Sequence, residues 1–182
     1  MNIERAQAVV GWMSDAELTY LAETAARSRS IVEIGSWKGR STLALACNCP
    51  GMVYAVDTWE GTEQQGDELA QHEPGWLFEE FKRNTAGCAN IVNCKGPSVE
   101  VAKWPSMAGL EFDMIFIDGY HAYEGVRDDI LSWRPMLRDG GILCGHDYIP
   151  PYWDGLLRAV HEFVPKFRVV PGTMIWTTEG AQ

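Results

Sequence analysis

The chain has 182 residues, of which 46% are hydrophobic and 22% are charged, and its formal net charge at pH 7 is −10. A chain of this length can bury one sizeable core, so we expect a single domain over residues 1–182. The negative charge repels phosphate backbones and excludes nucleic acid as the expected partner, whereas metal ions, amines and sulfonium groups are attracted.

The N-terminus and the cysteines indicate the expected compartment. Residues 1–12 lack the apolar run and the cleavage site of a signal peptide, and no stretch is long enough to cross a membrane. We therefore expect a soluble, cytoplasmic protein that does not bind a membrane. The five cysteines are odd in number and lack zinc-finger spacing, so we expect reduced thiols in or near the core.

Helices and strands alternate in the N-terminal half of the chain. Ser14 followed by Glu17 is a capping-box pattern that opens a helix ending near Arg27, so residues 1–29 are predicted to form a helical segment. The next predicted elements are a buried strand at 30–35, a helix at 39–47 and a strand ending near Asp57. The stretch 58–76 is polar and acidic without a clear period, and we interpret it as a lid loop.

The C-terminal half continues this alternation and closes with a hairpin. Its predicted elements are a helix at about 77–85, strands at about 89–95 and 111–117, a helix at 123–136, a strand at 140–146 and a helix at 154–163 capped by Asp154. Two final strands flank Pro171-Gly172, a turn signal that predicts an antiparallel hairpin. Strands that alternate with helices predict an α/β fold whose mostly parallel sheet is covered on both faces.

The residues that follow each strand are the candidate site, because ligands bind beyond the carboxyl ends of the strands in open α/β sheets. EIGSWKGRS follows the first strand and contains Glu33, Gly35, Ser36, Gly39 and Ser41. Its glycines let the backbone approach a ligand, and the following helix offers free N–H groups to an anionic group. The pattern is not the dinucleotide G-x-G-x-x-G, because Trp37 occupies the place of the second glycine.

The second and third strands are followed by candidates for binding a nucleoside. Asp57, with Thr58 after it, is placed to accept two hydrogen bonds from a ribose diol, although a helix cap or a solvated loop acid has the same pattern. KGPS follows the third strand and places Gly96 and Ser98 where an adenine would lie.

Four polar residues follow the last two parallel strands: Asp118 and His121 in FIDGYHAYEG, and His146 and Asp147 in GHDY. The two aspartates of this group, Asp118 and Asp147, are expected to face one crevice together with Glu33 and Asp57. So many acids repel a pyrophosphate and favour a cofactor that carries an ammonium and a sulfonium. The sequence therefore favours S-adenosylmethionine over NAD.

These motifs together resemble class I S-adenosylmethionine-dependent methyltransferases of the small-molecule O-methyltransferase group. The matching segments are VEIGSWKGRS, VYAVDTWEG, CKGPSVEVA, FDMIFIDGYHAYEGVRDDI and LRDGGILCGHDY, which occur in the family order between Ile31 and Tyr148. The D-G-x-H-x-Y segment and the later H-D-Y are similar to antibiotic-tailoring sugar O-methyltransferases. The resemblance implies a Rossmann-like, doubly wound sheet with a closing antiparallel hairpin strand.

The resemblance also implies which residues hold the cofactor. The glycine loop would hold the methionyl part, the acid after the second strand the ribose, and the residues after the third strand would border the adenine. The implied cofactor-binding residues are Glu33, Gly35, Ser36, Gly39, Ser41, Asp57, Thr58, Gly96, Ser98 and Asp118.

Catalysis is expected at the ends of the fourth and fifth strands, with or without a metal. In catechol-type relatives a magnesium ion there lowers the pKa of the acceptor hydroxyl, and the equivalent positions here are Asp118, His146 and Asp147. A histidine ligand suits manganese, iron or zinc better than magnesium. Alternatively, the site is metal-free and His121 or His146 removes the proton directly.

Each of these residues also has a purely structural interpretation. Asp118 could fix a turn, His121 could pack within its loop, and His146 could bond the neighbouring backbone. Asp128 and Asp129 are interpreted as a solvated helix face. The aromatic residues after the fifth strand either wall an acceptor pocket or pack at the sheet edge; they are Tyr148, Tyr152 and Trp153.

The sequence therefore predicts an enzyme that methylates a hydroxyl of a small molecule. The alternatives are a non-catalytic cofactor-binding or regulatory module on the same fold and, less favoured, an NAD(P)-linked oxidoreductase. Acceptor recognition is assigned to the N-terminal helix, the 58–76 loop, the segment after Asp147 or a partner subunit. Eight tryptophans make a homodimer an additional expectation, because exposed rings need cover.

Overall fold

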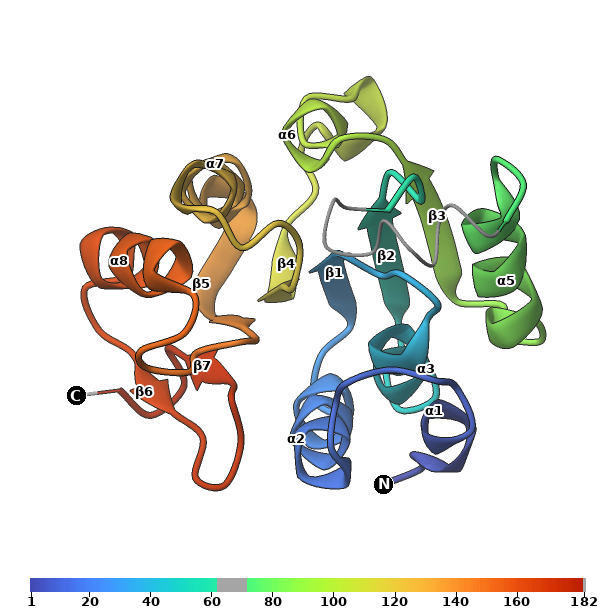
Figure 1. The fold of residues 1–182 in the computed structure, drawn as a ribbon, viewed down its shortest axis with the longest axis horizontal. Coiled ribbons are helices and arrows are strands. Elements are labelled where there is room, and N and C mark those ends of the chain that lie inside the picture. Colours follow the sequence, from blue (N-terminus) through green and yellow to red (C-terminus); the bar gives the residue numbers. More distant parts are fainter. Residues whose placement is uncertain (62–71, 182) are drawn as a thin grey trace.

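The computed structural model describes residues 1–61 and 72–181 of the chain. These residues form one sheet with the strand order β3-β2-β1-β4-β5-β7-β6 (Figure 1). The strands are β1 (Ser30–Ile34), β2 (Met52–Asp57), β3 (Ile91–Lys95), β4 (Phe112–Ile117), β5 (Leu137–Gly145), β6 (Arg168–Val169) and β7 (Trp176–Thr177). The first five strands, β1 through β5, each run parallel to their neighbours among these five. β7 runs antiparallel to both β5 and β6. The predicted mostly parallel sheet with a closing hairpin is confirmed.

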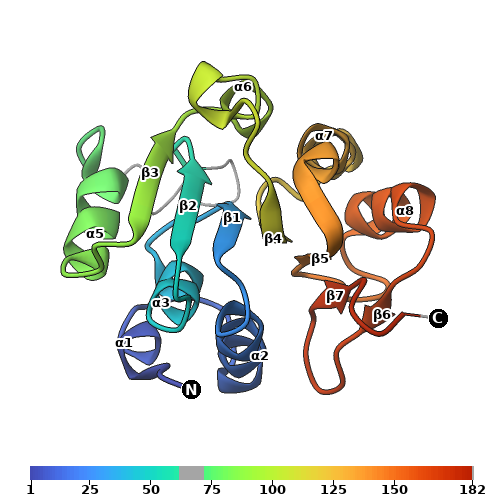
Figure 2. The same cartoon turned by 180° about the vertical axis from the view of Figure 1, so that it is seen from behind.

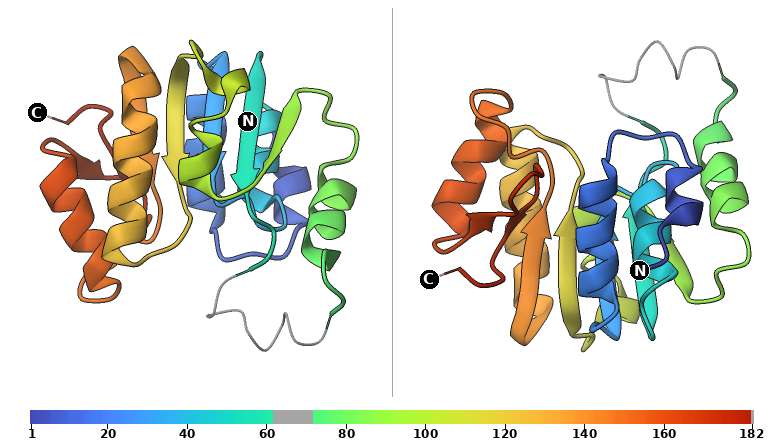
Figure 3. Two further views of the ribbon diagram at one scale, coloured as in Figure 1. Left: turned by 90° about the horizontal axis from the view of Figure 1, so that it is seen from above. Right: turned by 90° about the horizontal axis from the view of Figure 1, so that it is seen from below.

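Helices cover both faces of this sheet. They are α1 (Glu4–Gln7), α2 (Asp15–Ala25), α3 (Arg40–Ala46), α5 (Trp76–Thr85), α6 (Ser98–Val101), α7 (Tyr123–Trp133) and α8 (Asp154–Phe163), with 3₁₀ turns η2 (Pro105–Met107) and η3 (Arg134–Met136). Figures 1 and 2 show α1, α2 and α3 on one face and α6, α7 and α8 on the other, with α5 beside β3. Seen from above and below, the strands lie between these two helical layers (Figure 3).

The alternation of side chains along the strands builds a separate core on each face. Ile31 and Phe116 pack with α2 and α3, whereas Val32, Ile115 and Leu143 pack with α7 and α8. All five side chains are at most 1% exposed. Because neighbouring residues of a strand point to opposite faces, strands buried on both faces read as near-continuous apolar runs, as SIVEI and FDMIFI do here.

Helix ends follow the sequence predictions at α2 but not at α8. Ser14 and Glu17 form the predicted capping box, in which each side chain bonds the other residue's backbone N–H. Asp154 does not cap α8, because the N-cap is Trp153, a residue with φ 56° and no side-chain capping bond. β5 begins at Leu137, earlier than predicted, because that residue already pairs with Phe112 across a register shift.

The predicted lid loop lies largely outside the described residues. Residues 62–71 are not described, so the lid stays a prediction. On its N-terminal side Trp59 is buried at 1% exposure and packs on Phe78 and Phe81 of α5. On its C-terminal side Trp76 begins α5 rather than ending the loop. Both ends of this segment are thus anchored against one helix.

Three further expectations concern membranes, cysteines and tryptophans. Among the described residues, no helix is long and apolar enough to cross a membrane. All five cysteines are free thiols that are buried or partly buried, as expected. Only Trp12 and Trp153 among the tryptophans are exposed, which leaves fewer rings to cover than the composition suggested. The homodimer stays a prediction.

A buried acid joins α6 to α7. Asp129 is 6% exposed and accepts a hydrogen bond from the Ser98 hydroxyl, which itself accepts one from the Trp133 indole at 3.0 Å. The interpretation of Asp129 as part of a solvated helix face is therefore wrong, because α6 covers it. Burial raises the pKa of Asp129 to about 6, and the Ser98 hydrogen bond opposes this shift.

The strand ends that position the candidate site are in register. Ile34 pairs with both Val56 and Ile117, and Ile117 pairs with Gly145. The pairing continues one residue further, since the N–H of Gly35 donates to Val56 at 2.9 Å and that of Asp118 to Ile34 at 2.8 Å. Consequently Gly35, Asp57, Asp118 and His146, each following one of these aligned residues, stand side by side along one edge of the sheet.

Gly35 is the position where two strand ends approach too closely for a side chain. Its φ is +88°, and a Cβ there would lie 2.0 Å from the carbonyl oxygen of Asp118 and 2.8 Å from the backbone nitrogen of Gly119. Both neighbours are backbone atoms that belong to the paired strand end. Glycine is therefore required for packing between β1 and β4, besides any contact with a ligand.

Replacing Gly35 by alanine should separate these strand ends. We expect Gly35→Ala to lower the free energy of unfolding by more than about 4 kcal/mol, because overpacking adds to backbone strain. Gly140→Ala is the matched control, since Gly140 also has a positive φ but a Cβ there meets no atom within 4 Å. Its expected cost is about 1–2 kcal/mol. Urea denaturation measures both, and equal losses would contradict the packing requirement.

Burial of Asp129 should appear in the pH dependence of stability. In the folded protein Asp129 keeps its proton up to about pH 6, whereas an aspartate in the unfolded chain releases its proton near pH 3.8. Its stabilising contribution is therefore present below pH 3.8 and lost as the pH rises through 6. Wild type should lose stability over this range as Asp129 ionises, whereas Asp129→Asn has no proton to lose there. Between pH 4 and pH 7 the free energy of unfolding of Asp129→Asn should therefore rise relative to wild type by on the order of 2 kcal/mol, as measured by urea titration. Asp154→Asn, at an exposed acid of α8, is the control, and a constant difference between wild type and Asp129→Asn would contradict the assignment.

Candidate functional site

A cavity of about 990 Å³ opens at the carboxyl ends of β1, β2, β3, β4 and β5. Most of the site residues expected from the sequence line it: Gly35, Ser36, Ser41, Asp57, Thr58, Gly96, Ser98, Asp118, His121, His146 and Asp147. The described lining residues do not include Glu33 or Gly39. The register of the strand ends thus brings eleven separately predicted residues to one cavity.

Glu33 and Gly39 hold the glycine loop in shape from behind. Glu33 is fully buried, and its carboxylate accepts hydrogen bonds from the hydroxyls of Ser36, at 2.7 Å, and Thr42. Burial raises the pKa of Glu33, and these hydroxyls oppose the shift. Gly39 has φ +89°, and a Cβ there would lie 2.9 Å from Thr85 of α5. The structure therefore places both residues behind the cavity wall.

Asp57 is oriented by the backbone on either side of it. Its Oδ2 accepts the N–H of Trp37 at 2.8 Å, and its Oδ1 accepts the N–H of Trp59 at 2.7 Å. Burial raises the pKa of Asp57, and these backbone donors oppose the shift. Each carboxylate oxygen can accept more than one hydrogen bond, so the group keeps capacity for a diol in the cavity.

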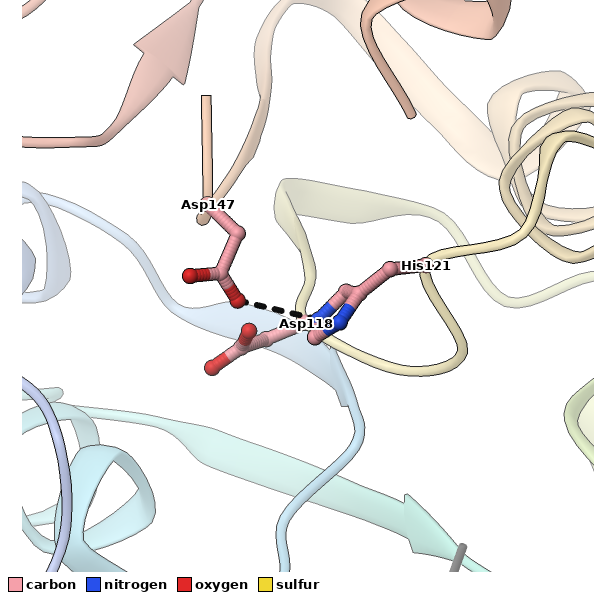
Figure 4. Close-up of side chains that lie close together, drawn as sticks. All are labelled: Asp118, His121 and Asp147. Carbon is pink, nitrogen blue, oxygen red and sulfur yellow. Dashed lines mark ion pairs between the residues drawn. The ribbon is translucent and has the colours of Figure 1, made fainter. Parts of the chain in front are cut away.

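Asp118, His121 and Asp147 form a compact cluster at the other end of the cavity. Figure 4 shows their side chains converging from the end of β4, the loop after it and the loop after β5. One ligand atom from each residue lies within 4.8 Å of the others. Nε2 of His121 is 2.9 Å from Oδ2 of Asp147, yet neither ring nitrogen of His121 has an aligned hydrogen-bond partner among the described residues. Such unsatisfied nitrogen atoms beside two carboxylates are suited to binding a cation.

Asp147 reaches this cluster through an unusual backbone conformation. Its φ is +58°, a region that non-glycine residues rarely adopt. Among the described residues, the other non-glycine residues with positive φ are Trp37, Trp59 and Trp153, and each lies beside the cavity or next to a residue that lines it. Strained backbone of this kind is commonly found at functional sites.

His146 lies behind the cluster, where three carboxylates surround it. It is 3% exposed; its Nε2 is 3.1 Å from Glu17, and its Nδ1 is 3.7 Å from Asp118 and 3.5 Å from Asp147. Burial lowers the pKa of His146, but these carboxylates outweigh it and raise the pKa to about 10. Because both ring nitrogens face carboxylates, His146 is expected to carry both protons. The side chains that lie close enough together to hold a cation include His121 and not His146, and the metal-ligand role expected of His146 stays a prediction.

The carboxylates around His146 respond in different ways. Burial raises the pKa of Asp118 to about 7; the nearby imidazole of His146 opposes that shift, and Asp147 adds to it. Burial would raise the pKa of Asp147 too, but His121 and His146 hold it below its ordinary value. Two neighbouring carboxylates with such different affinities for a proton are a common feature of catalytic sites.

Glu17 is a site residue that the sequence reasoning missed. It was interpreted only as the capping-box residue of α2, yet Oε1 also accepts the N–H of Met174 at 2.8 Å and faces His146. Burial raises the pKa of Glu17, but the bonds to His146, Met174 and Ser14 outweigh it and lower the pKa to about 2. Its only sequence signal was the cap, because the contact with His146 joins residues far apart in the chain.

The aromatic residues after β5 do not all line the cavity, as a pocket wall would require. Trp153 lines the cavity and packs on the ring of His121, with centroids 4.6 Å apart. Tyr148 instead bonds His161 at 2.8 Å, and neither it nor Tyr152 is among the described lining residues. Near the cluster the cavity is thus lined by Trp153 and by Tyr120, a residue of the loop after β4.

Comparison with known proteins agrees with this geometry. A family model described as a methyltransferase domain matches residues 32–148. An uncharacterised protein of Sinorhizobium fredii, y4gI, is 28% identical over 139 residues, which are 68% of this chain but only 13% of that protein. The chain therefore spans about an eighth of the length of this relative.

Several solved structures share the fold at low sequence identity. The calicheamicin methyltransferase CalS11 superimposes with a TM-score of 0.67 at 16% identity, covering 89% of this chain and 76% of CalS11. The Podospora anserina methyltransferase PaMTH1 superimposes with a TM-score of 0.63 at 18% identity, covering 96% of this chain and 84% of PaMTH1. The O-methyltransferase TomG of Streptomyces achromogenes superimposes with a TM-score of 0.61 at 15% identity, covering 91% of this chain and 79% of TomG. At these identities the likeness establishes the fold alone.

The family match covers more than half of the chain and includes every strand end that builds the cavity from Gly35 to Asp147. The chain therefore belongs to the methyltransferase-domain family.

Proposed function

We propose that this chain is an S-adenosylmethionine-dependent methyltransferase that methylates a hydroxyl oxygen of a small molecule. The observation that carries the proposal is the arrangement within one cavity. Asp57 stands at the end of β2, and the cluster of Asp118, His121 and Asp147 stands at the ends of β4 and β5. A nucleoside-binding acid on β2 and a reactive cluster after β4 and β5, separated only by β1, match the needs of a two-substrate transfer.

The charges of the cavity favour the proposed cofactor. Asp57, Asp118, Asp129 and Asp147 all line it, and the chain carries a formal net charge of −10. These carboxylates attract an ammonium and a sulfonium and repel a pyrophosphate, which disfavours the NAD(P)-linked alternative. PaMTH1 was solved with S-adenosylhomocysteine and TomG with S-adenosylmethionine, which supports the same choice.

The acceptor is proposed to be a small molecule that binds near Trp153 and Tyr120. One structure of CalS11 describes it as a TDP-rhamnose 3′-O-methyltransferase, and TomG is an O-methyltransferase of tomaymycin synthesis. Both names support oxygen as the atom that receives the methyl group. The cluster gives this assignment its chemical basis, because a hydroxyl must lose its proton as it attacks the methyl group.

A divalent cation fits the residues of the cluster. Asp118, Asp147 and His121 would hold it, and the structural observation that favours this fit is that one ligand atom from each lies within 4.8 Å of the others, with Nδ1 of His121 lacking a hydrogen-bond partner among the described residues. A mixed oxygen and nitrogen donor set suits manganese, iron or zinc better than magnesium. When bound, such a cation would lower the pKa of an acceptor hydroxyl.

The protein's own residues supply positioning. Asp147 orients His121, and the ring of Trp153 packs against the same histidine. Glu17 holds the His146 imidazole in place, and the positive charge of His146 offsets the negative charge of Asp118 and Asp147. Without a cation, His121 is better placed than His146 to accept a proton, because both nitrogens of His146 already face carboxylates. In-line displacement needs chiefly this alignment.

Loss of Asp57 should remove cofactor binding. Asp57→Ala should weaken binding of S-adenosylmethionine at least about 30-fold in isothermal titration, because two charge-assisted hydrogen bonds to the ribose are lost. Asp113→Ala is a matched control: Asp113 also accepts two backbone N–H bonds, from Arg29 and Ser30, but lies on β4 away from the cavity. Wild-type protein should not bind NAD. Unchanged affinity in Asp57→Ala would sink the ribose assignment.

Removal of a cation should abolish activity if the cluster binds one. We expect EDTA treatment to stop methyl transfer and added Mn²⁺ to restore it, with Mn²⁺ binding measured directly by the loss of its free EPR signal. Asp147→Asn and His121→Ala should each weaken this binding at least about tenfold, because each removes a ligand. His161→Ala, at a histidine bonded to Tyr148, should not. Full activity in EDTA would eliminate the cation and leave proton removal to His121.

A further inference from the structure

Arg40 ties an N-terminal strap, residues 6–13, to the helix that follows the glycine loop. It is the first residue of α3, and its guanidinium donates five hydrogen bonds to backbone carbonyls. Nη1 bonds Ala6, Gln7 and Val9 at 3.2, 3.1 and 2.6 Å, and Nε and Nη2 bond Met13 at 3.0 and 2.8 Å. A planar fork with donors in fixed directions is suited to such a set, whereas a lysine ammonium is not.

The strap that Arg40 holds is part of the cavity wall. Gly11, Trp12 and Met13 line the cavity together with Arg40 itself. Gly11 lies directly on the stem of the arginine, since a Cβ there would be 2.7 Å from its Cδ. The fit between strap and arginine therefore depends on shape as well as on hydrogen bonding.

Trp12 connects the strap to the residues that orient Asp57. Its ring is stacked on that of Trp37, with centroids 4.4 Å apart, although 69% of Trp12 is exposed. The backbone of Trp37 donates to Asp57 and accepts a 2.8 Å hydrogen bond from the Trp59 indole. A continuous set of contacts thus runs from Arg40 through Trp12 and Trp37 to the carboxylate assigned to the ribose.

We propose that Arg40 is a positioning residue for cofactor binding, which fixes the strap as a wall of the cavity and steadies the glycine loop through Trp12. The inference rests on the proposed cofactor site and adds the N-terminal segment to it. Arg40 acts here through backbone carbonyls and the strap, and need not contact the cofactor. Its effect should appear in cofactor affinity more than in the stability of the ligand-free protein.

The test compares the affinity for S-adenosylhomocysteine of full-length variants by isothermal titration. Arg40→Ala should bind about tenfold or more weakly, since ordering the strap then consumes binding energy, and Arg40→Lys should fall between it and wild type. Hydrogen exchange should be faster at residues 6–13 in Arg40→Ala, and saturating ligand should slow it again. Arg134→Ala, which removes one guanidinium bond to the Phe163 carbonyl on α8, should keep wild-type affinity.

Two smaller changes test the strap without removing the guanidinium. Gly11→Ala crowds the stem of Arg40, and Trp12→Ala removes an exposed ring whose loss costs little folding stability. Each should weaken binding about threefold or more. These variants decide the question if Arg40→Ala does not fold, and wild-type affinity in both would overturn the proposal.

The outcomes separate this inference from the proposed function. Wild-type affinity in a folded Arg40→Ala whose strap exchanges rapidly would overturn the role of Arg40 and leave the cofactor site standing. Absence of any binding by the wild-type protein would overturn the cofactor site itself, and the role of Arg40 with it.

Discussion

The site depends on the close contact between the carboxyl ends of β1 and β4. The Asp118 N–H donates to the Ile34 carbonyl at 2.8 Å, and the Asp118 carbonyl occupies the place that a side chain on Gly35 would need. This contact sets the register that puts the glycine loop beside the reactive cluster. Asp57 and His146 then join the same edge through pairing of β2 with β1 and of β5 with β4. The sites that we propose for cofactor and acceptor are neighbours because the backbones of these two strand ends leave no space between them.

The electrostatics of the site centre on His146. Glu17, Asp118 and Asp147 surround this buried imidazole, and its charge makes the proximity of three carboxylates tolerable. Their attraction outweighs the cost of burying a cation, which explains the raised pKa of His146. His121 faces one of the same carboxylates, with its Nε2 2.9 Å from Oδ2 of Asp147, and its Nδ1 has no hydrogen-bond partner among the described residues. His146 thus balances charge within the fold, while His121 belongs to the cluster that our proposal assigns to the chemistry.

Local pattern was enough to predict the fold and the edge of the sheet that carries the site. Apolar strands, the capping box and the turn at Pro171-Gly172 act through neighbouring residues, and strand ends follow from them. The remaining features depend on contacts between distant residues. Asp129 lies in a polar stretch of α7 and is buried only because α6 packs over it. Likewise, the surroundings of His146 include Glu17, a residue far earlier in the chain, and Asp147 adopts a φ of +58° that its sequence neighbours do not indicate.

The strand register, the glycine loop and the acidic cluster are the basis of our proposal that two substrates of a methyltransferase meet between Asp57 and His121. A crystal structure with S-adenosylhomocysteine and Mn²⁺ tests this account most directly. We expect the ribose hydroxyls on the Asp57 carboxylate, the sulfur directed toward the cluster, and the ion bound by Asp118, His121 and Asp147. A ribose bound away from Asp57, or an ion held by His146 in place of His121, would contradict it.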